Sequence, residues 1–239
     1  MSTSRPRSSS SSSPRRPARA GWRWLGGGLS LALALALGVA GAAPADEESA
    51  DGRWRLSADD TAVTVRALDG TTVRRHEARS LDGREAGRPR WLRAVPPRTS
   101  FLVAFDGLQE LWEIPLDPRA EPIYDGFVHD YQMGEGIAKP GFLGVRRVRL
   151  PQALHAFAVD RSGAFVLGRG ADEPDGRAVL LLVQLDVRRA IGRFVVAADP
   201  DLALAEARSI DGRDHLVVPD RRGGPPLVLD VRAARVQHR

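Results

Sequence analysis

The sequence predicts an all-β protein of β-propeller type with about four recognisable blades. After residue 45, short apolar runs alternate with Asp-Gly and Gly-containing turns, and no stretch has the spacing of a convincing helix. Two landmarks also recur: Asp160 and Asp211 lie 51 residues apart, and the Asp-Val pairs beginning at Asp186 and Asp230 lie 44 apart. Blades recur at roughly 40 to 50 residues. This recurrence favours a propeller over a β-sandwich, which would also give short strands and Gly/Asp turns.

The strands follow one another in strand-turn-strand units along the chain. The run 61–65 alternates and enters the Asp69-Gly70 turn. The stretch 90–118 is typical of a hairpin, because the apolar run 101–105 is followed by an Asp-Gly turn and a second strand at 111–114. Further strands are expected at 156–159, 164–168, 179–187, 192–196, 207–210, 215–218 and 227–231. No closing strand is recognisable in 231–239.

Residues 1–45 have the three parts of an export signal. Six arginines between Arg5 and Arg23 form a basic region, an uncharged stretch with an apolar centre at 29–37 follows, and small residues offer cleavage after Ala42 or Ala45. The alternative is an uncleaved membrane anchor, since a span needs roughly 20 apolar residues. We therefore expect a signal peptide at 1–45 and a periplasmic or secreted domain at 46–239, which meets a membrane only if the segment stays uncleaved.

The charge of the expected mature domain excludes one class of partner. All 30 acidic residues follow residue 45, whereas 6 of the 35 basic residues precede it, so the remainder carries 29 − 30 = −1. The whole-chain pI of about 10.7 is thus a property of the signal segment. It gives no support to nucleic-acid binding.

Cysteine is absent from the chain. This excludes a disulfide framework, a thiolate metal site, a cysteine nucleophile and a CxxCH haem attachment. The histidines lack zinc spacing, and no serine lies in a GxSxG elbow, so no metal ligand and no catalytic residue is predicted. Stability must come from packing.

The segments 90–118, 154–170, 180–196 and the stretch after Asp199 resemble, in order, consecutive blades of the d₁-haem domain of cytochrome cd₁ nitrite reductase. The resemblance extends to relatives in d₁-haem biosynthesis and to haem-free propellers of the same superfamily, and it covers most of 90–218. It implies a propeller fold and makes haem d₁ the cofactor to consider.

The chain departs from that family at its active site. Pro96-Pro97-Arg98 stands where the reductase has a histidine before the strand, Asp199-Pro200-Asp201 replaces a His-Pro-Gly context, and the iron-binding histidine has no counterpart. Nitrite reduction is therefore not expected. The resemblance also implies a ring of eight blades, of which this chain supplies about four. A four-bladed ring, a half-ring completed by a second copy or partner, and a truncated relic all remain open, and the last two are favoured.

The long connection 117–150 holds the candidate binding residues. Loops beyond about 12 to 15 residues are usually functional or disordered. A histidine and a methionine four residues apart could approach an iron, a tyrosine could add an oxygen ligand, and arginines could clamp propionates or another anion. The candidates are His129, Tyr131, Met133, Arg146, Arg147 and Arg149. The structural alternative is that the aromatic residues pack the loop onto the sheet and that the arginines form a solvated strand edge.

Taken together, these observations predict an exported, non-catalytic binding protein of propeller type. Two alternatives remain: a d₁-haem biosynthesis or haem-handling protein of denitrification, and a protein-interaction scaffold. The expected partner is a tetrapyrrole or a protein, including a second copy that completes a ring.

Overall fold

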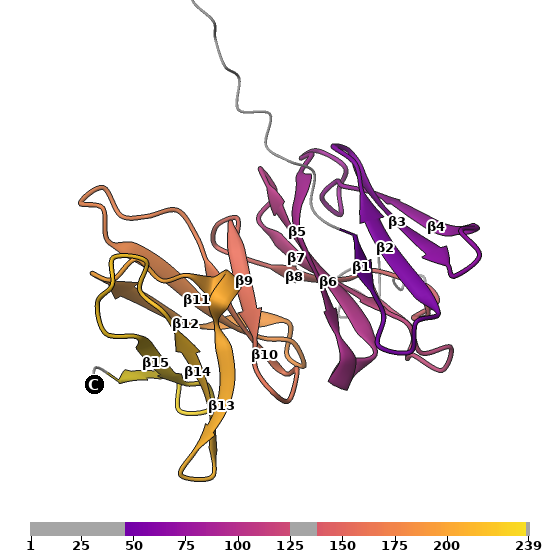
Figure 1. Ribbon diagram of the computed structural model, residues 1–239. Helices are drawn as coiled ribbons and strands as arrows, with labels where there is room; N and C mark the ends of the chain where they lie inside the picture. Colours follow the sequence, from indigo (N-terminus) through magenta and orange to yellow (C-terminus); the bar gives the residue numbers. More distant parts are fainter. Residues whose placement is uncertain (1–45, 125–137, 238–239) are drawn as a thin grey trace, which may run out of the picture. The chain divides into compact units, whose positions relative to one another are not determined.

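The computed structural model of the protein describes residues 46–124 and 138–237, and all of them belong to one compact unit. The described residues form sixteen strands in four successive groups of four (Figure 1). The expected signal segment and the loop residues 125–137 lie outside this part of the chain.

Each group of four strands is an antiparallel meander in chain order. The first sheet contains β1 (Glu47–Glu48), β2 (Trp54–Ala58), β3 (Ala62–Ala67) and β4 (Thr72–Glu77). The second contains β5 (Arg88–Val95), β6 (Ser100–Asp106), β7 (Glu110–Pro115) and β8 (Arg146–Arg149). The third contains β9 (Ala156–Val159), β10 (Phe165–Arg169), β11 (Ala178–Gln184) and β12 (Arg189–Val196). The fourth contains β13 (Glu206–Ile210), β14 (Arg213–Val218), β15 (Leu227–Asp230) and β16 (Arg235–Gln237).

Four-stranded meanders that follow one another along the chain are the blades of a propeller-type fold, which confirms the predicted fold class. The sequence landmarks occupy equivalent turns. Asp160 and Asp211 both lie between the first and second strands of their sheets, and Asp186 and Asp230 both lie where the third strand turns into the fourth. One parallel pair, Arg189 with Arg149, joins β12 to β8, so the second and third groups are hydrogen-bonded into one eight-stranded sheet. Each group of four strands is nevertheless called a sheet below.

The core fills the space between successive sheets in three clusters. Strand β6 is buried on both faces, with Phe101, Val103 and Phe105 in the cluster shared with the first sheet and Leu102 and Ala104 in the cluster shared with the third. This explains why the strand is a continuous apolar run rather than an alternating one. The third cluster joins β10 and β11 to the fourth sheet.

Several predicted strand boundaries were wrong. Asp186 and Val187 belong to a turn rather than to the end of β11. The predicted loop 117–150 contains β8, and a strand, β16, does follow residue 231. The sequence RRVR of β8 carries no apolar run because Arg146 and Arg147 face carboxylates and Arg149 is exposed.

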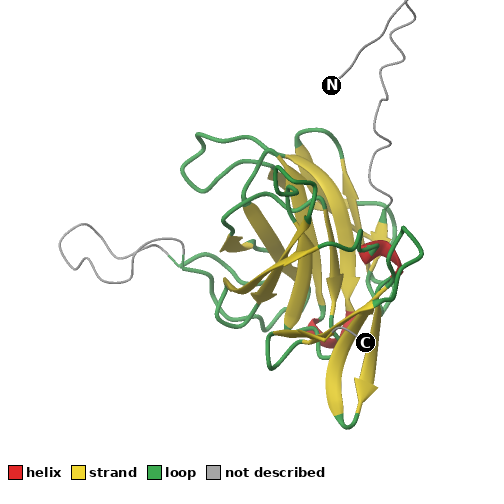
Figure 2. Cartoon of the chain, turned by 90° about the vertical axis from the view of Figure 1, so that its left-hand side faces the viewer, coloured by secondary structure: helices red, strands yellow, loops and turns green. Residues whose placement is uncertain are grey.

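Helical structure in the described residues is confined to two 3₁₀ turns, η1 (Pro96–Arg98) and η2 (Leu202–Leu204) (Figure 2). The described part of the chain contains no helix with the length and hydropathy needed to cross a bilayer.

Candidate functional site

The base of the long connection, residues 117–124 and 138–145, is fixed between the first and second sheets. Ile123 and Lys139 exchange two backbone hydrogen bonds of 2.9 and 2.8 Å, and the Leu143 amide donates to the Pro115 carbonyl of β7 at 2.8 Å. Phe142 meets Trp54 of β2 edge to face, with ring centroids 5.7 Å apart. The base is therefore attached to both sheets. The predicted ligands His129, Tyr131 and Met133 lie outside the described residues and stay predictions.

His76 of β4 completes the attachment. Its Nε2 donates to the Leu143 carbonyl at 2.9 Å, which fixes the tautomer, because a carbonyl only accepts. Burial of the ring lowers the pKa of His76 to about 4, and the cations Arg74 and Arg147 act in the same direction. The ring is therefore neutral at physiological pH and has a structural role here.

Of the three predicted site residues that the structure describes, Arg147 makes the most contacts. Its Nη1 donates to Glu110 Oε2 at 2.6 Å and to the Arg79 carbonyl at 2.7 Å, and its guanidinium lies 4.4 Å from the centroid of the Trp112 ring. The Trp112 Nε1 donates to the same Glu110 oxygen at 2.7 Å. This arrangement ties β8 and β7 to the chain segment that leaves the first sheet.

Arg146 and Arg149 have different environments. Strand alternation points Arg146 to the face opposite Arg147. There its Nη1 lies 3.8 Å from Glu113 Oε2. Arg149 is exposed, and no ion pair of its side chain is found within residues 46–124 and 138–237. The structure thus divides the three arginines between two faces of β8.

Glu110 and Glu113 are the residues that sequence reasoning missed. Glu113 is 3% exposed and accepts from Arg98 Nε at 2.7 Å, and Arg98 Nη1 also reaches Asp186 of the third sheet at 2.7 Å. The two glutamates in the otherwise apolar run ELWEIP could have indicated buried ion pairs, because buried charges need partners. Strand β7 therefore carries one ion-paired carboxylate on each face, and each is linked to a different neighbouring sheet.

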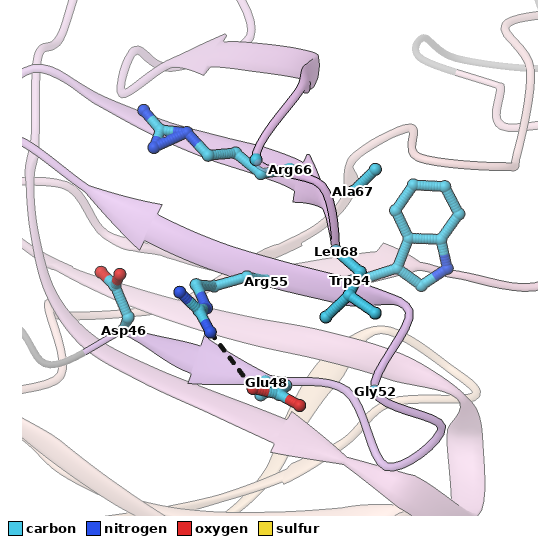
Figure 3. A pocket seen from close by; sticks show the side chains of 9 residues that line it. Asp46, Glu48, Gly52, Trp54, Arg55, Arg66, Ala67 and Leu68 are labelled. Atoms are coloured by element: carbon cyan, nitrogen blue, oxygen red, sulfur yellow. Dashed lines mark hydrogen bonds and ion pairs between the residues drawn. The ribbon is translucent and has the colours of Figure 1, made fainter.

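A pocket of about 180 Å³ lies on the first sheet (Figure 3). Asp46, Glu48, Arg55 and Arg66 are among its lining residues, and Arg55 Nη2 lies 3.4 Å from Glu48 Oε2. The two positive and two negative charges balance. No group of three or more His, Cys, Asp or Glu side chains that could hold a metal ion occurs among the residues that the structure describes.

We expect the free energy of unfolding to fall as the pH drops from about 6.5 to about 4, through the linkage of His76. In that window His76 binds a proton in the unfolded chain but not in the folded protein, so protonation favours unfolding. The loss should be on the order of 2–3 kcal/mol. Urea unfolding of the protein and of His76→Gln at both ends of the window measures it. The substitution should remove this share of the pH dependence, and His155→Gln, at an exposed histidine, should retain it.

The comparisons with known proteins concern the fold. No family model matches the sequence, and no curated protein matches it. A solved structure described as "Dihydro-heme d1 dehydrogenase NirN in complex with DHE" is 21% identical, with a TM-score of 0.61, and the match covers 81% of this chain and 36% of that one. The chain therefore spans about a third of that protein's length.

Two further solved structures are similar at lower TM-scores. Apo AztD from Citrobacter koseri is 12% identical, with a TM-score of 0.48 and coverage of 80% of this chain and 45% of that one. The Cps50 (Swd1) β-propeller domain from Myceliophteria thermophila is 18% identical, with a TM-score of 0.43 and coverage of 74% and 48%. The chain has a propeller-type fold, and the expected partial resemblance to d₁-haem propellers is confirmed.

Proposed function

We propose that this chain is an exported binding protein of propeller type that carries out no chemistry of its own. The observation that carries the proposal is that the two buried carboxylates of β7 are engaged in holding sheets together. Arg147 is paired with Glu110, and Arg98 with Glu113, so neither carboxylate is free to act as an acid or base. Binding then falls to the loops, which is where propeller-type scaffolds present functional residues.

Export rests on residues 1–45, whose basic, apolar and small-residue regions are those of a signal peptide. The mature domain would then be periplasmic or secreted. A second copy is the simplest protein partner, because four sheets are half of the ring that the d₁-type resemblance implies.

Haem handling is the second candidate, and the likeness to NirN in complex with DHE favours it. A tetrapyrrole would use His129, Tyr131 and Met133 as candidate ligands and Arg149 as the exposed cation for a propionate. Arg146 and Arg147 suit this role less well, because each already faces a carboxylate that is at most 5% exposed. Drawing Arg147 away would leave the buried Glu110 carboxylate without its cation.

A visible-spectrum titration of the purified full-length protein with haem d₁ and haem b separates the two candidates. We expect the visible spectrum to stay unchanged, because Arg146 and Arg147 already face carboxylates. We also expect in-cell cross-linking at the long connection 117–150 to recover a protein partner. His129→Ala and Arg149→Ala are the matched variants, and neither alters a contact described above. A saturable Soret shift that weakens in both variants would replace the proposal with haem handling.

A further inference from the structure

The fourth sheet has one apolar face and one polar face. Leu216, Val218, Leu227 and Leu229 belong to the core cluster shared with the third sheet. Alternation therefore turns His215 of β14 and Asp230 of β15 to the other face, where the strand register sets them directly opposite each other. Both are nevertheless only 3% exposed. A buried histidine beside a buried carboxylate needs an explanation in hydrogen bonds.

The two side chains face each other without a donor between them. His215 Nδ1 donates to the Arg213 carbonyl at 3.0 Å, which leaves Nε2 as the ring nitrogen that faces Asp230. Nε2 lies 4.0 Å from Asp230 Oδ2, and Arg213 Nη1 lies 3.7 Å from the same oxygen. Both distances exceed those of hydrogen bonds. Asp230 Oδ1, in contrast, accepts from the Arg232 and Ala233 amides at 3.1 and 2.9 Å. An N–H donor from a ligand would therefore find its acceptor at Nε2.

A cavity of about 270 Å³ opens at this position. It is lined by Ile210, Asp211, Arg213, His215 and Gln237. A water molecule occupies about 30 Å³ in the liquid, so the cavity has room for a small organic molecule. The Arg213 side chain is 72% exposed and can bend over the opening.

The charge around the cavity is balanced rather than of one sign. The polar face and its hairpin turn carry Arg208, Arg213 and Arg235 against Glu206, Asp211 and Asp230. Apart from His215, these three positive and three negative charges sum to zero. A ligand that carries both signs fits this field better than a simple anion or cation does.

We propose that this pocket binds a small zwitterion of the α-amino-acid class. The ammonium group would donate to His215 Nε2, which lines the pocket, while Asp230 lies behind that ring and outside the lining. The carboxylate would accept from the Arg213 guanidinium, which is suited to two parallel hydrogen bonds. The site lies on a different sheet from the long connection. It depends neither on export nor on the identity of the loop's partner.

The test is an NMR titration of the ¹⁵N-labelled full-length protein at constant pH, observing the imidazole nitrogens. L-Alanine is the probe, propylamine is the amine without a carboxylate, and propionate is the carboxylate without an amine. L-Alanine should shift the His215 Nε2 signal saturably, propylamine should do so more weakly, and propionate should leave it unmoved. The exposed ring of His155 is the internal reference.

Arg213→Ala should weaken L-alanine binding about tenfold, which corresponds to one charge-assisted contact of about 1.4 kcal/mol, and should leave propylamine binding unchanged. Arg149→Ala, which removes an exposed arginine on another sheet, is the matched control and should bind like the parent. The proposal fails if L-alanine produces no saturable shift at His215, if propionate is as effective, or if Arg149→Ala weakens binding as much as Arg213→Ala does.

Discussion

Glu110→Ala should lower the free energy of unfolding by about 3–5 kcal/mol, the usual loss when one partner of a buried ion pair is removed. The Glu110 carboxylate is 5% exposed and accepts from both Arg147 Nη1 and Trp112 Nε1. Truncation leaves a guanidinium and a buried indole N–H without their acceptor. Urea unfolding followed by tryptophan fluorescence measures the loss.

Three variants make that result specific. Glu77→Ala removes the same charge from a side chain that is 74% exposed and only loosely paired with Arg79, so it should change stability by less than about 1 kcal/mol. Glu110→Gln keeps one acceptor oxygen for Trp112 and should fall between the two. The double variant Glu110→Ala/Arg147→Ala should be less unstable than the sum of its single changes. Equal losses in Glu110→Ala and Glu77→Ala would contradict the assignment of Glu110 as a buried anchor.

Gly141→Ala should destabilise the base of the long connection by about 3 kcal/mol, at the upper end of the cost of overpacking. A Cβ at this position would overlap the backbone carbonyls of Ala120 and Glu121, and a backbone cannot rotate aside as a side chain can. The strain should break the Ile123–Lys139 pairing. Hydrogen exchange at those two amides measures local opening, and urea unfolding measures the global loss.

Gly170→Ala is the matched comparison for that change. Its Cβ would meet only the side chain of Gln152, which is free to adopt another rotamer. We expect a loss below about 1 kcal/mol and unchanged exchange at Ile123 and Lys139. If both substitutions speed hydrogen exchange at Ile123 and Lys139 equally, the close backbone approach at Gly141 is not what holds the base of the long connection in place.

The sequence was sufficient to predict the strands that are buried on both faces. The runs at 101–105 and 179–183 are apolar throughout because each contacts two other sheets, and such runs stand out in any pattern analysis. Strand β4, with sequence TVRRHE, is mostly exposed, so it carries no hydrophobic signal. Register and hydrogen bonding, rather than its own composition, make it a strand.

The candidate site was less predictable, for a physical reason. The sequence of β8 is compatible with anion clamps or with a solvated strand edge, but the partners of Arg146 and Arg147 lie on β7, about 35 residues earlier in the chain. A contact so distant in sequence leaves no local spacing pattern. The His215–Asp230 pair was missed for the same reason, since only the register of β14 against β15 sets the two residues opposite each other.

The two carboxylates of β7 also bear on how the molecule unfolds. In an array of repeats, each unit is stabilised by its own contacts and by those to its nearest neighbours. Glu110 connects through Arg147 to the carbonyl of Arg79, and Glu113 connects through Arg98 to Asp186, so the second sheet is coupled electrostatically on both sides. Partial unfolding should therefore start at the fourth sheet and reach the second sheet last, so that the first three sheets behave as one cooperative unit.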